Sequence, residues 1–136
     1  ECTRYTSLLS QFPTDIVCLG IGENGHIAFN DPDVANFNDH KLVKIVKLDH
    51  VCRQQQVNEK CFETLEQVPT EALTLTIPAL LKAKWMFCIV PFKNKSQAVY
   101  RTIHGDISEK CPASILRRKE KSSLYLDTES AQLLNL

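Results

Sequence analysis

The sequence predicts an α/β fold built on a Rossmann-like, mostly parallel sheet flanked by helices. Residues 15–20 (DIVCLG) and 85–90 (WMFCIV) are short, continuous apolar runs. Such runs are typical of strands that are buried on both faces of a parallel sheet. Helical stretches alternate with further strand candidates along the chain, and this order favours helices layered against a sheet.

Three more strands are expected. Residues 41–48 are rich in β-branched side chains and partly alternate between polar and apolar, which predicts a half-exposed strand. Residues 72–76 and 123–127 are the fourth and fifth candidates.

Helices are expected in the gaps between these strands. The predicted ranges are 51–62, 77–84, 95–104 and 128–134, and residues 2–9 have the character of the end of a helix. Gly105 directly follows the third range, as expected for a helix C-terminus. Because no repeat or linker-like stretch interrupts the chain, we expect residues 1–136 to form one domain or part of one.

Composition limits the classes of partner. With 136 residues, 43% of them hydrophobic, the chain is long enough for one core. Its 16 basic and 16 acidic residues cancel, so no overall field favours nucleic acid or an anionic membrane. No apolar run approaches the roughly 20 residues that span a bilayer. The six cysteines form no CxxC pair and no zinc-like spacing with the histidines, so we expect reduced thiols, a cytoplasmic location and no metal.

A glycine-rich loop follows the first predicted strand. Gly20, Gly22 and Gly25 spell G-x-G-x-x-G, the first half of a dinucleotide-binding fingerprint. That fingerprint requires a long helix starting at the third glycine. Pro32 and a turn-rich segment follow instead, which argues against a nucleotide site.

Two other interpretations of this loop remain open from the residues alone. Gly22 and Gly25 would let a ligand approach the backbone closely, and Asn24, His26 and Asp31 gather polar groups beside them. A histidine near a carboxylate is suited to proton transfer at neutral pH. The alternative is a polar turn in which the histidine and its neighbours only cap the backbone.

The run LGIGENGHIAFNDP, residues 19–32, closely resembles the signature of the glucosamine-6-phosphate deaminase family. The related 6-phosphogluconolactonases share the glycines and the histidine but continue differently after them. The likeness extends through residues 58–62, 67–74, 93–99, 105–108 and 111–116. It implies that residues 1–136 are the C-terminal part of a single glucosamine-6-phosphate isomerase-like domain whose N-terminal half is absent from this sequence.

The resemblance also implies an activity. Family members convert glucosamine 6-phosphate and water to fructose 6-phosphate and ammonia in amino-sugar catabolism, without a metal or organic cofactor. His26 matches the acid/base that opens the sugar ring. Asp31, at a position more often occupied by glutamate, would orient and polarise His26, and Asn24 would complete this set by hydrogen bonding.

For the substrate's phosphate, the resemblance implies two lysines and the loop glycines. Lys95 matches a phosphate-binding lysine at the start of a helix, where free N–H groups also favour an anion. Lys60 falls where some members have an arginine, and it would keep the charge but lose the bidentate fork. Gly22 and Gly25 would bring the backbone close to the ligand. A solvated surface charge is the alternative for either lysine.

Other functional residues of the family lie upstream of the matched region. They are a glycine- and serine-rich phosphate loop and the aspartate that moves a proton between C2 and C1 of the sugar. Without them, the resemblance implies that residues 1–136 do not deaminate. Galactosamine 6-phosphate as substrate, hydrolysis of 6-phosphogluconolactone, a non-catalytic sugar-phosphate sensor and assembly into a homo-oligomer are the alternatives left open.

Overall fold

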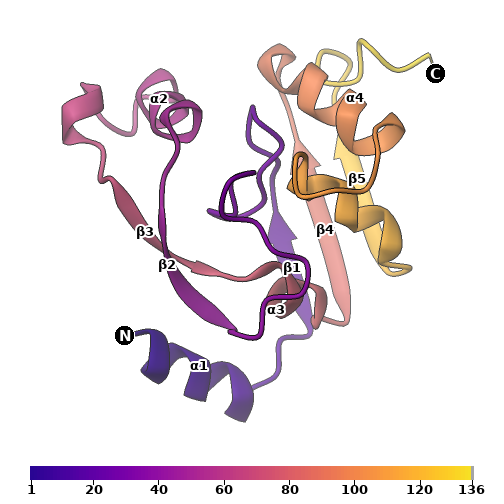
Figure 1. The fold of residues 1–136 in the computed structure, drawn as a ribbon. Coiled ribbons are helices and arrows are strands. Elements are labelled where there is room, and N and C mark those ends of the chain that lie inside the picture. Colours follow the sequence, from indigo (N-terminus) through magenta and orange to yellow (C-terminus); the bar gives the residue numbers. More distant parts are fainter. Residues whose placement is uncertain (136) are drawn as a thin grey trace.

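The computed structural model describes residues 1–135 and contains a three-stranded parallel sheet (Figure 1). Its strands are β1 (Ile16–Leu19), β4 (Trp85–Val90) and β5 (Ser122–Leu126), in the order β1-β4-β5. Val17 pairs with Met86, and Cys88 pairs with Leu124, so β4 is the central strand. The predicted parallel sheet is confirmed.

Two of the predicted strands lie outside this sheet. β2 (Val43–Lys47) and β3 (Glu71–Leu75) pair with each other as an antiparallel ribbon. In β2, Val43 and Val46 are buried while Ile45 is exposed, so the strand is half-exposed as expected. Alternating burial of this kind suits an antiparallel ribbon better than the interior of a parallel sheet.

The helices begin close to their predicted starts, but two of them are shorter than predicted. They are α1 (Cys2–Gln11), α2 (His50–Asn58), α3 (Ile77–Leu81) and α4 (Ser96–His104), with 3-10 turns η1 (Leu65–Gln67), η2 (Lys93–Lys95) and η3 (Pro112–Arg118). α2 stops before its predicted end at Phe62 because Lys60 adopts a left-handed backbone with a φ of 60°. Thr76 caps α3 by accepting from the amide of Ala79.

The helix predicted for residues 128–134 is wrong, because the structure has only turns there. The side chain of Asp127 accepts a hydrogen bond from the amide of Ser130 at 2.7 Å, and the Ser130 hydroxyl accepts from the Asp127 amide at 3.1 Å. These local bonds offer the backbone an alternative to helix formation.

The core occupies one face of the parallel sheet. Met86, Cys88 and Val90 of β4 are buried there with Val99 of α4, and Figure 1 shows α4 and η3 in front of β4 and β5. The opposite face carries exposed apolar side chains, namely Ile16 (55% exposed), Ile89 (48%), Tyr125 (52%) and Trp85 (42%). Since parallel sheets are normally covered on both faces, residues 1–135 supply only one of the two covering layers.

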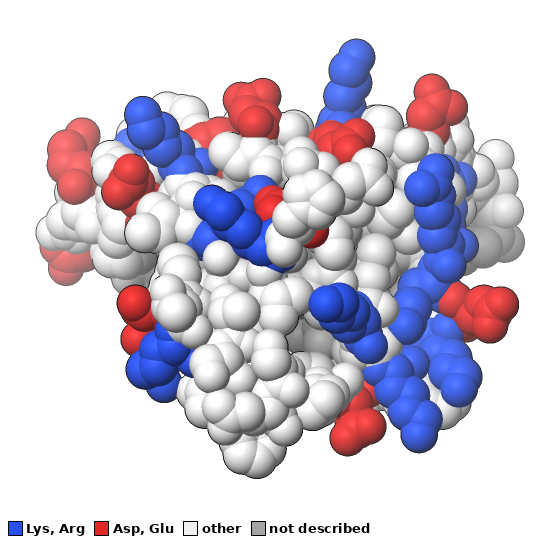
Figure 2. All heavy atoms as spheres, turned by 60° about the horizontal axis from the view of Figure 1, so that its bottom comes forward, with Lys and Arg blue, Asp and Glu red and all other residues white. Residues whose placement is uncertain are grey.

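The zero net charge conceals a local basic region at the amino ends of β4 and β5. A hollow there is lined by Lys82, Lys84, Arg118, Lys119 and Lys121 together with Glu120. Figure 2 views the molecule from this side and shows basic side chains gathered on its right, with both signs mixed elsewhere. Among the helices of residues 1–135, none has the length and apolar character needed to cross a membrane.

Candidate functional site

A pocket lies where the loops after β1 and β4 meet. Because these strands are parallel neighbours, their carboxyl ends open onto the same edge of the sheet, where α/β folds bind ligands. The pocket has a volume of about 410 Å³. Its lining consists of Gly20, Ile21, Gly22, His26, Ala28, Gln55, Glu59, Ile89, Val90, Pro91, Phe92 and Lys95.

His26 lines this pocket, and its ring orientation is fixed. Its Nδ1 lies 2.8 Å from Oδ1 of Asn24 and 2.9 Å from Oδ1 of Asp31. The same Asn24 oxygen accepts from the backbone amide of His26 at 3.0 Å, which identifies it as the carbonyl oxygen. Both neighbours of Nδ1 are therefore acceptors, so Nδ1 carries the proton and Nε2 of the neutral ring keeps a free lone pair.

Asn24 and Asp31 belong to a larger network that includes Asp49. The Asn24 amide donates to Oδ1 of Asp31 at 2.9 Å and to Oδ2 of Asp49 at 2.7 Å. The backbone amide of Asp49 donates to Oδ2 of Asp31 at 3.2 Å, and the Asp49 side chain caps α2 at Cys52. Despite its shorter side chain, Asp31 thus reaches His26 while it is also held by the start of α2.

This network lowers the pKa of Asp31. Burial alone would raise the pKa of this carboxyl, which is 1% exposed. Hydrogen bonds from His26, Asn24 and the backbone of Asp49 outweigh burial, and the pKa falls below its ordinary value of 3.8. Asp31 is therefore a carboxylate at neutral pH, as a group that polarises an imidazole must be.

The two loop glycines serve packing inside the protein. A Cβ on Gly22 would lie 2.1 Å from Cε1 of His26, so the imidazole stacks directly on that backbone. Gly25 has a φ of 92°, and a Cβ there would lie 2.8 Å from Sγ of Cys111. Gly22 also lines the pocket, whereas Gly25 does not.

Lys95 lines the same pocket. It is only 6% exposed, and it immediately precedes α4. Its Nζ lies 3.3 Å from Oε1 of Glu59, and Gln55 donates to the same oxygen at 2.8 Å. The pocket wall also contains Ala28 (φ 50°) and Phe92 (φ 80°), non-glycine residues in the left-handed region, where strain is often stored at functional sites.

The structure does not bring Lys60 to this pocket. Lys60 is exposed and lines a separate hollow beside Cys61, Phe62 and Glu63. Of the sequence-predicted residues, His26, Lys95 and Gly22 line the pocket, while Asn24 and Asp31 lie behind His26 and can act only through it.

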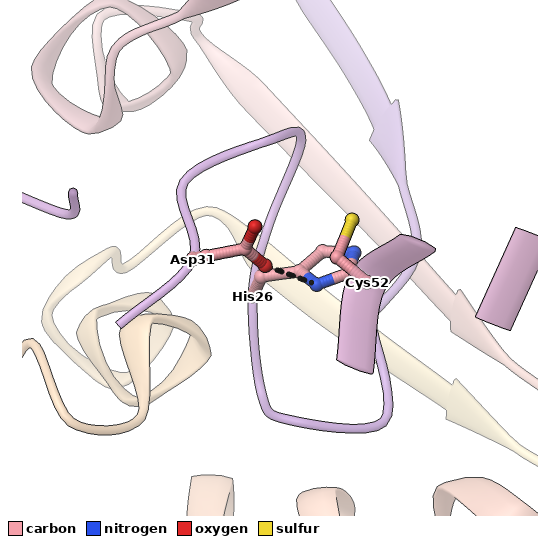
Figure 3. A group of neighbouring side chains, drawn as sticks. All are labelled: His26, Asp31 and Cys52. Carbon is pink, nitrogen blue, oxygen red and sulfur yellow. Dashed lines mark ion pairs between the residues drawn. The ribbon is translucent and has the colours of Figure 1, made fainter. Parts of the chain in front are cut away.

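His26, Asp31 and Cys52 form a compact cluster (Figure 3). One potential ligand atom from each lies within 4.8 Å of the other two. Burial raises the pKa of the Cys52 thiol to about 12, and the carboxylates of Asp31 and Asp49 contribute to this rise. Without a metal, the buried Cys52 thiol is therefore neutral, and it would have to lose its proton to become a ligand. The structure pairs none of the six cysteines in a disulfide.

Sequence reasoning missed three polar residues of the site. Asp49 directly precedes α2, and a helix-capping aspartate could have been recognised there. Gln55 and Glu59 lie four residues apart on one helix face, a spacing that brings side chains together. Gln55 accepts from the backbone amide of Glu23 in the loop after β1, and Glu59 pairs with Lys95 after β4. Neither contact had a signal in the sequence.

Comparison with known proteins identifies the family. The family described as glucosamine-6-phosphate isomerases/6-phosphogluconolactonase matches residues 1–125. The chain is 40% identical over 134 residues to a glucosamine-6-phosphate deaminase of Listeria monocytogenes, covering 98% of this chain and 55% of the relative. It is 41% identical over 133 residues to the deaminase of Bacillus cereus, covering 98% of this chain and 49% of the relative.

Solved structures agree with this assignment. A monomeric glucosamine-6-phosphate deaminase superposes with a TM-score of 0.89 at 37% identity, over 97% of this chain and 53% of the other. The 6-phosphogluconolactonase of Trypanosoma cruzi superposes with a TM-score of 0.72 at 18% identity, over 99% of this chain and 51% of the other, and shows the shared fold only. The chain thus spans about half the length of the relatives it matches. It belongs to the family of glucosamine-6-phosphate isomerases and 6-phosphogluconolactonases.

Proposed function

We propose that this chain supplies the ring-opening half of a glucosamine-6-phosphate deaminase site, with His26 as acid/base and Lys95 as the phosphate-binding residue. The observation that carries the proposal is the arrangement of His26. Its Nδ1 faces two acceptors, so Nε2 is the nitrogen left for chemistry in a pocket shared with a buried lysine.

The chemistry follows from that tautomer. Nε2 accepts the proton of the anomeric hydroxyl, the bond between C1 and the ring oxygen breaks, and the proton is returned to the ring oxygen. The imidazolium formed between these steps is stabilised by the Asp31 carboxylate 2.9 Å from Nδ1. Asn24 and Asp49 keep that carboxylate in place.

The phosphate would bind at Lys95. Its ammonium group supplies a positive charge there, and the start of α4 adds the partial positive charge of a helix N-terminus. A phosphate held by Lys95 would keep the sugar in the pocket that His26 also lines.

Deamination is favoured over lactone hydrolysis by the degree of similarity. The deaminases match at about 40% identity over nearly the whole chain, whereas the solved lactonase of Trypanosoma cruzi matches at 18%. The complete reaction also requires proton transfer from C2 to C1, which we assign to residues in the part of the domain that relatives have beyond the matched half. A cytoplasmic location and a homo-oligomer stay predictions.

The proposal is tested by separating ring opening from the later steps. Interconversion of the α and β anomers of glucosamine 6-phosphate, followed by NMR exchange, requires only ring opening. We expect residues 1–136 to accelerate this exchange without releasing ammonia, and a longer form that restores the other half to release it.

Two outcomes would favour the other classes. Hydrolysis of 6-phosphogluconolactone without acceleration of anomer exchange would indicate a lactonase. Binding of the sugar phosphate that is unaffected by His26→Ala, without any turnover, would indicate a sensor. Ammonia release by residues 1–136 alone would contradict the assignment of the C2 base to another part of the domain.

A further inference from the structure

Glu59 places a carboxylate where the proposed function needs a phosphate. Its Oε1 lies 3.3 Å from Nζ of Lys95, the buried lysine of the pocket to which we assign the phosphate. Lys95 and Glu59 are the lysine and the acidic residue of the lining, so their formal charges cancel. In this state the pocket presents no net positive charge to an anion.

The two partners differ in their access to water. The Lys95 side chain is 8% exposed, and the Glu59 side chain is 44% exposed. Glu59 caps the C-terminal end of α2, and Gln55 steadies its carboxylate at 2.8 Å. Rotating Glu59 into solvent therefore exposes a group that is already half-hydrated, whereas moving Lys95 would disrupt the packing around a buried side chain.

We propose that Glu59 is an internal competitor for the anion site at Lys95 and thereby sets the site's affinity for phosphate. An incoming phosphate displaces the Glu59 carboxylate, because the two anions repel each other at one ammonium group. The inference rests on the proposed function and adds to it a residue that tunes binding of the phosphate group without touching the reacting atoms.

The test is a calorimetric titration of residues 1–136 with inorganic phosphate, using Glu59→Gln. Glutamine keeps the shape and can still accept from Gln55, but it removes the competing charge. Releasing a half-exposed ion pair should tighten phosphate binding by roughly 2- to 5-fold. Glu63→Gln is the matched control, because it changes net charge equally but lies by the separate hollow near Lys60. We expect that control to change affinity by less than about twofold.

Lys95→Met separates failure of this inference from failure of the proposed function. If Lys95→Met weakens phosphate binding by about 10-fold or more and Glu59→Gln tightens it, both proposals stand. If Lys95→Met weakens binding this much but the phosphate affinity of Glu59→Gln is no higher than that of wild type or of Glu63→Gln, the competitor role is refuted and the anion site stands. A phosphate affinity that Lys95→Met leaves unchanged overturns both. Thermal unfolding of each variant verifies that the fold is retained.

Discussion

Two parts of the pocket lining, around His26 and around Lys95, are held in different ways. Behind His26, Asn24, Asp31 and Asp49 hydrogen-bond one another in buried or half-buried positions. Among residues 1–135, Lys95 forms one ion pair, with a half-exposed carboxylate. The first arrangement fixes one geometry and the second can be exchanged. We infer that the His26 site is preorganised for chemistry and that the Lys95 site is built for reversible binding.

The largest effect is expected from His26→Gln. Glutamine cannot exchange a proton near neutral pH, so anomer exchange should fall by about 100-fold or more. Phosphate affinity should stay unchanged, because Lys95 is untouched. Both are measured on the same preparation, by NMR exchange and by calorimetry. An equal loss of phosphate binding would show that the His26 and Lys95 sites are not independent.

Gly22→Ala tests whether the ring position is as tightly defined as the hydrogen bonds indicate. The added Cβ would lie 2.1 Å from the imidazole, so the ring must move, and we expect a loss of roughly 100-fold in anomer exchange. Gly20→Ala is the matched control, since its Cβ would meet only Ile89 O at 3.4 Å. Similar rates of anomer exchange for the two variants would refute a rigid His26 site.

The next comparison is between two lysines. Lys95→Met should weaken phosphate binding by about 10-fold or more because it removes the buried charge. Lys60→Met should change binding by less than about twofold, because Lys60 lines a different hollow. Comparable losses in the titration would indicate that Lys60 moves into the pocket on binding.

The smallest effect concerns stability. The pKa of Asp31 is lowered in the folded state, so its ionised form stabilises the fold above the ordinary pKa of 3.8, and this contribution is lost as pH falls below that value. We expect Asp31→Asn to lower the free energy of unfolding by about 1–3 kcal/mol at pH 7. The difference from wild type should shrink below pH 3.8. Urea unfolding at several pH values measures this, and a constant difference would contradict the role assigned to Asp31.

Local sequence patterns predicted much of the fold. The apolar runs at 15–20 and 85–90 became β1 and β4, and the β-branched run at 41–48 became β2. The failures have local causes that pattern alone does not reveal. α2 ends at Asn58 because Lys60 adopts a left-handed conformation, and the Asp127–Ser130 hydrogen bonds replace the helix expected at 128–134.

The polar loop was the part of the site that sequence could predict. Asn24, His26 and Asp31 lie within eight residues of one another, so a single turn can bring them together. Asp49 and Glu59 could not be assigned in this way, because their partners lie in distant segments. Only the packing of α2 against the two loops decides those contacts.

The sequence by itself determined the family, the strand-loop segment that carries His26 and the alternation of elements that makes an α/β fold. The tertiary structure decided that β2 and β3 form a separate ribbon, that Gly22 makes room for an imidazole and that Lys95, not Lys60, shares the pocket with His26. The physical reason is the parallel pairing of β1 with β4, which joins two loops that are remote in sequence at one edge of the sheet.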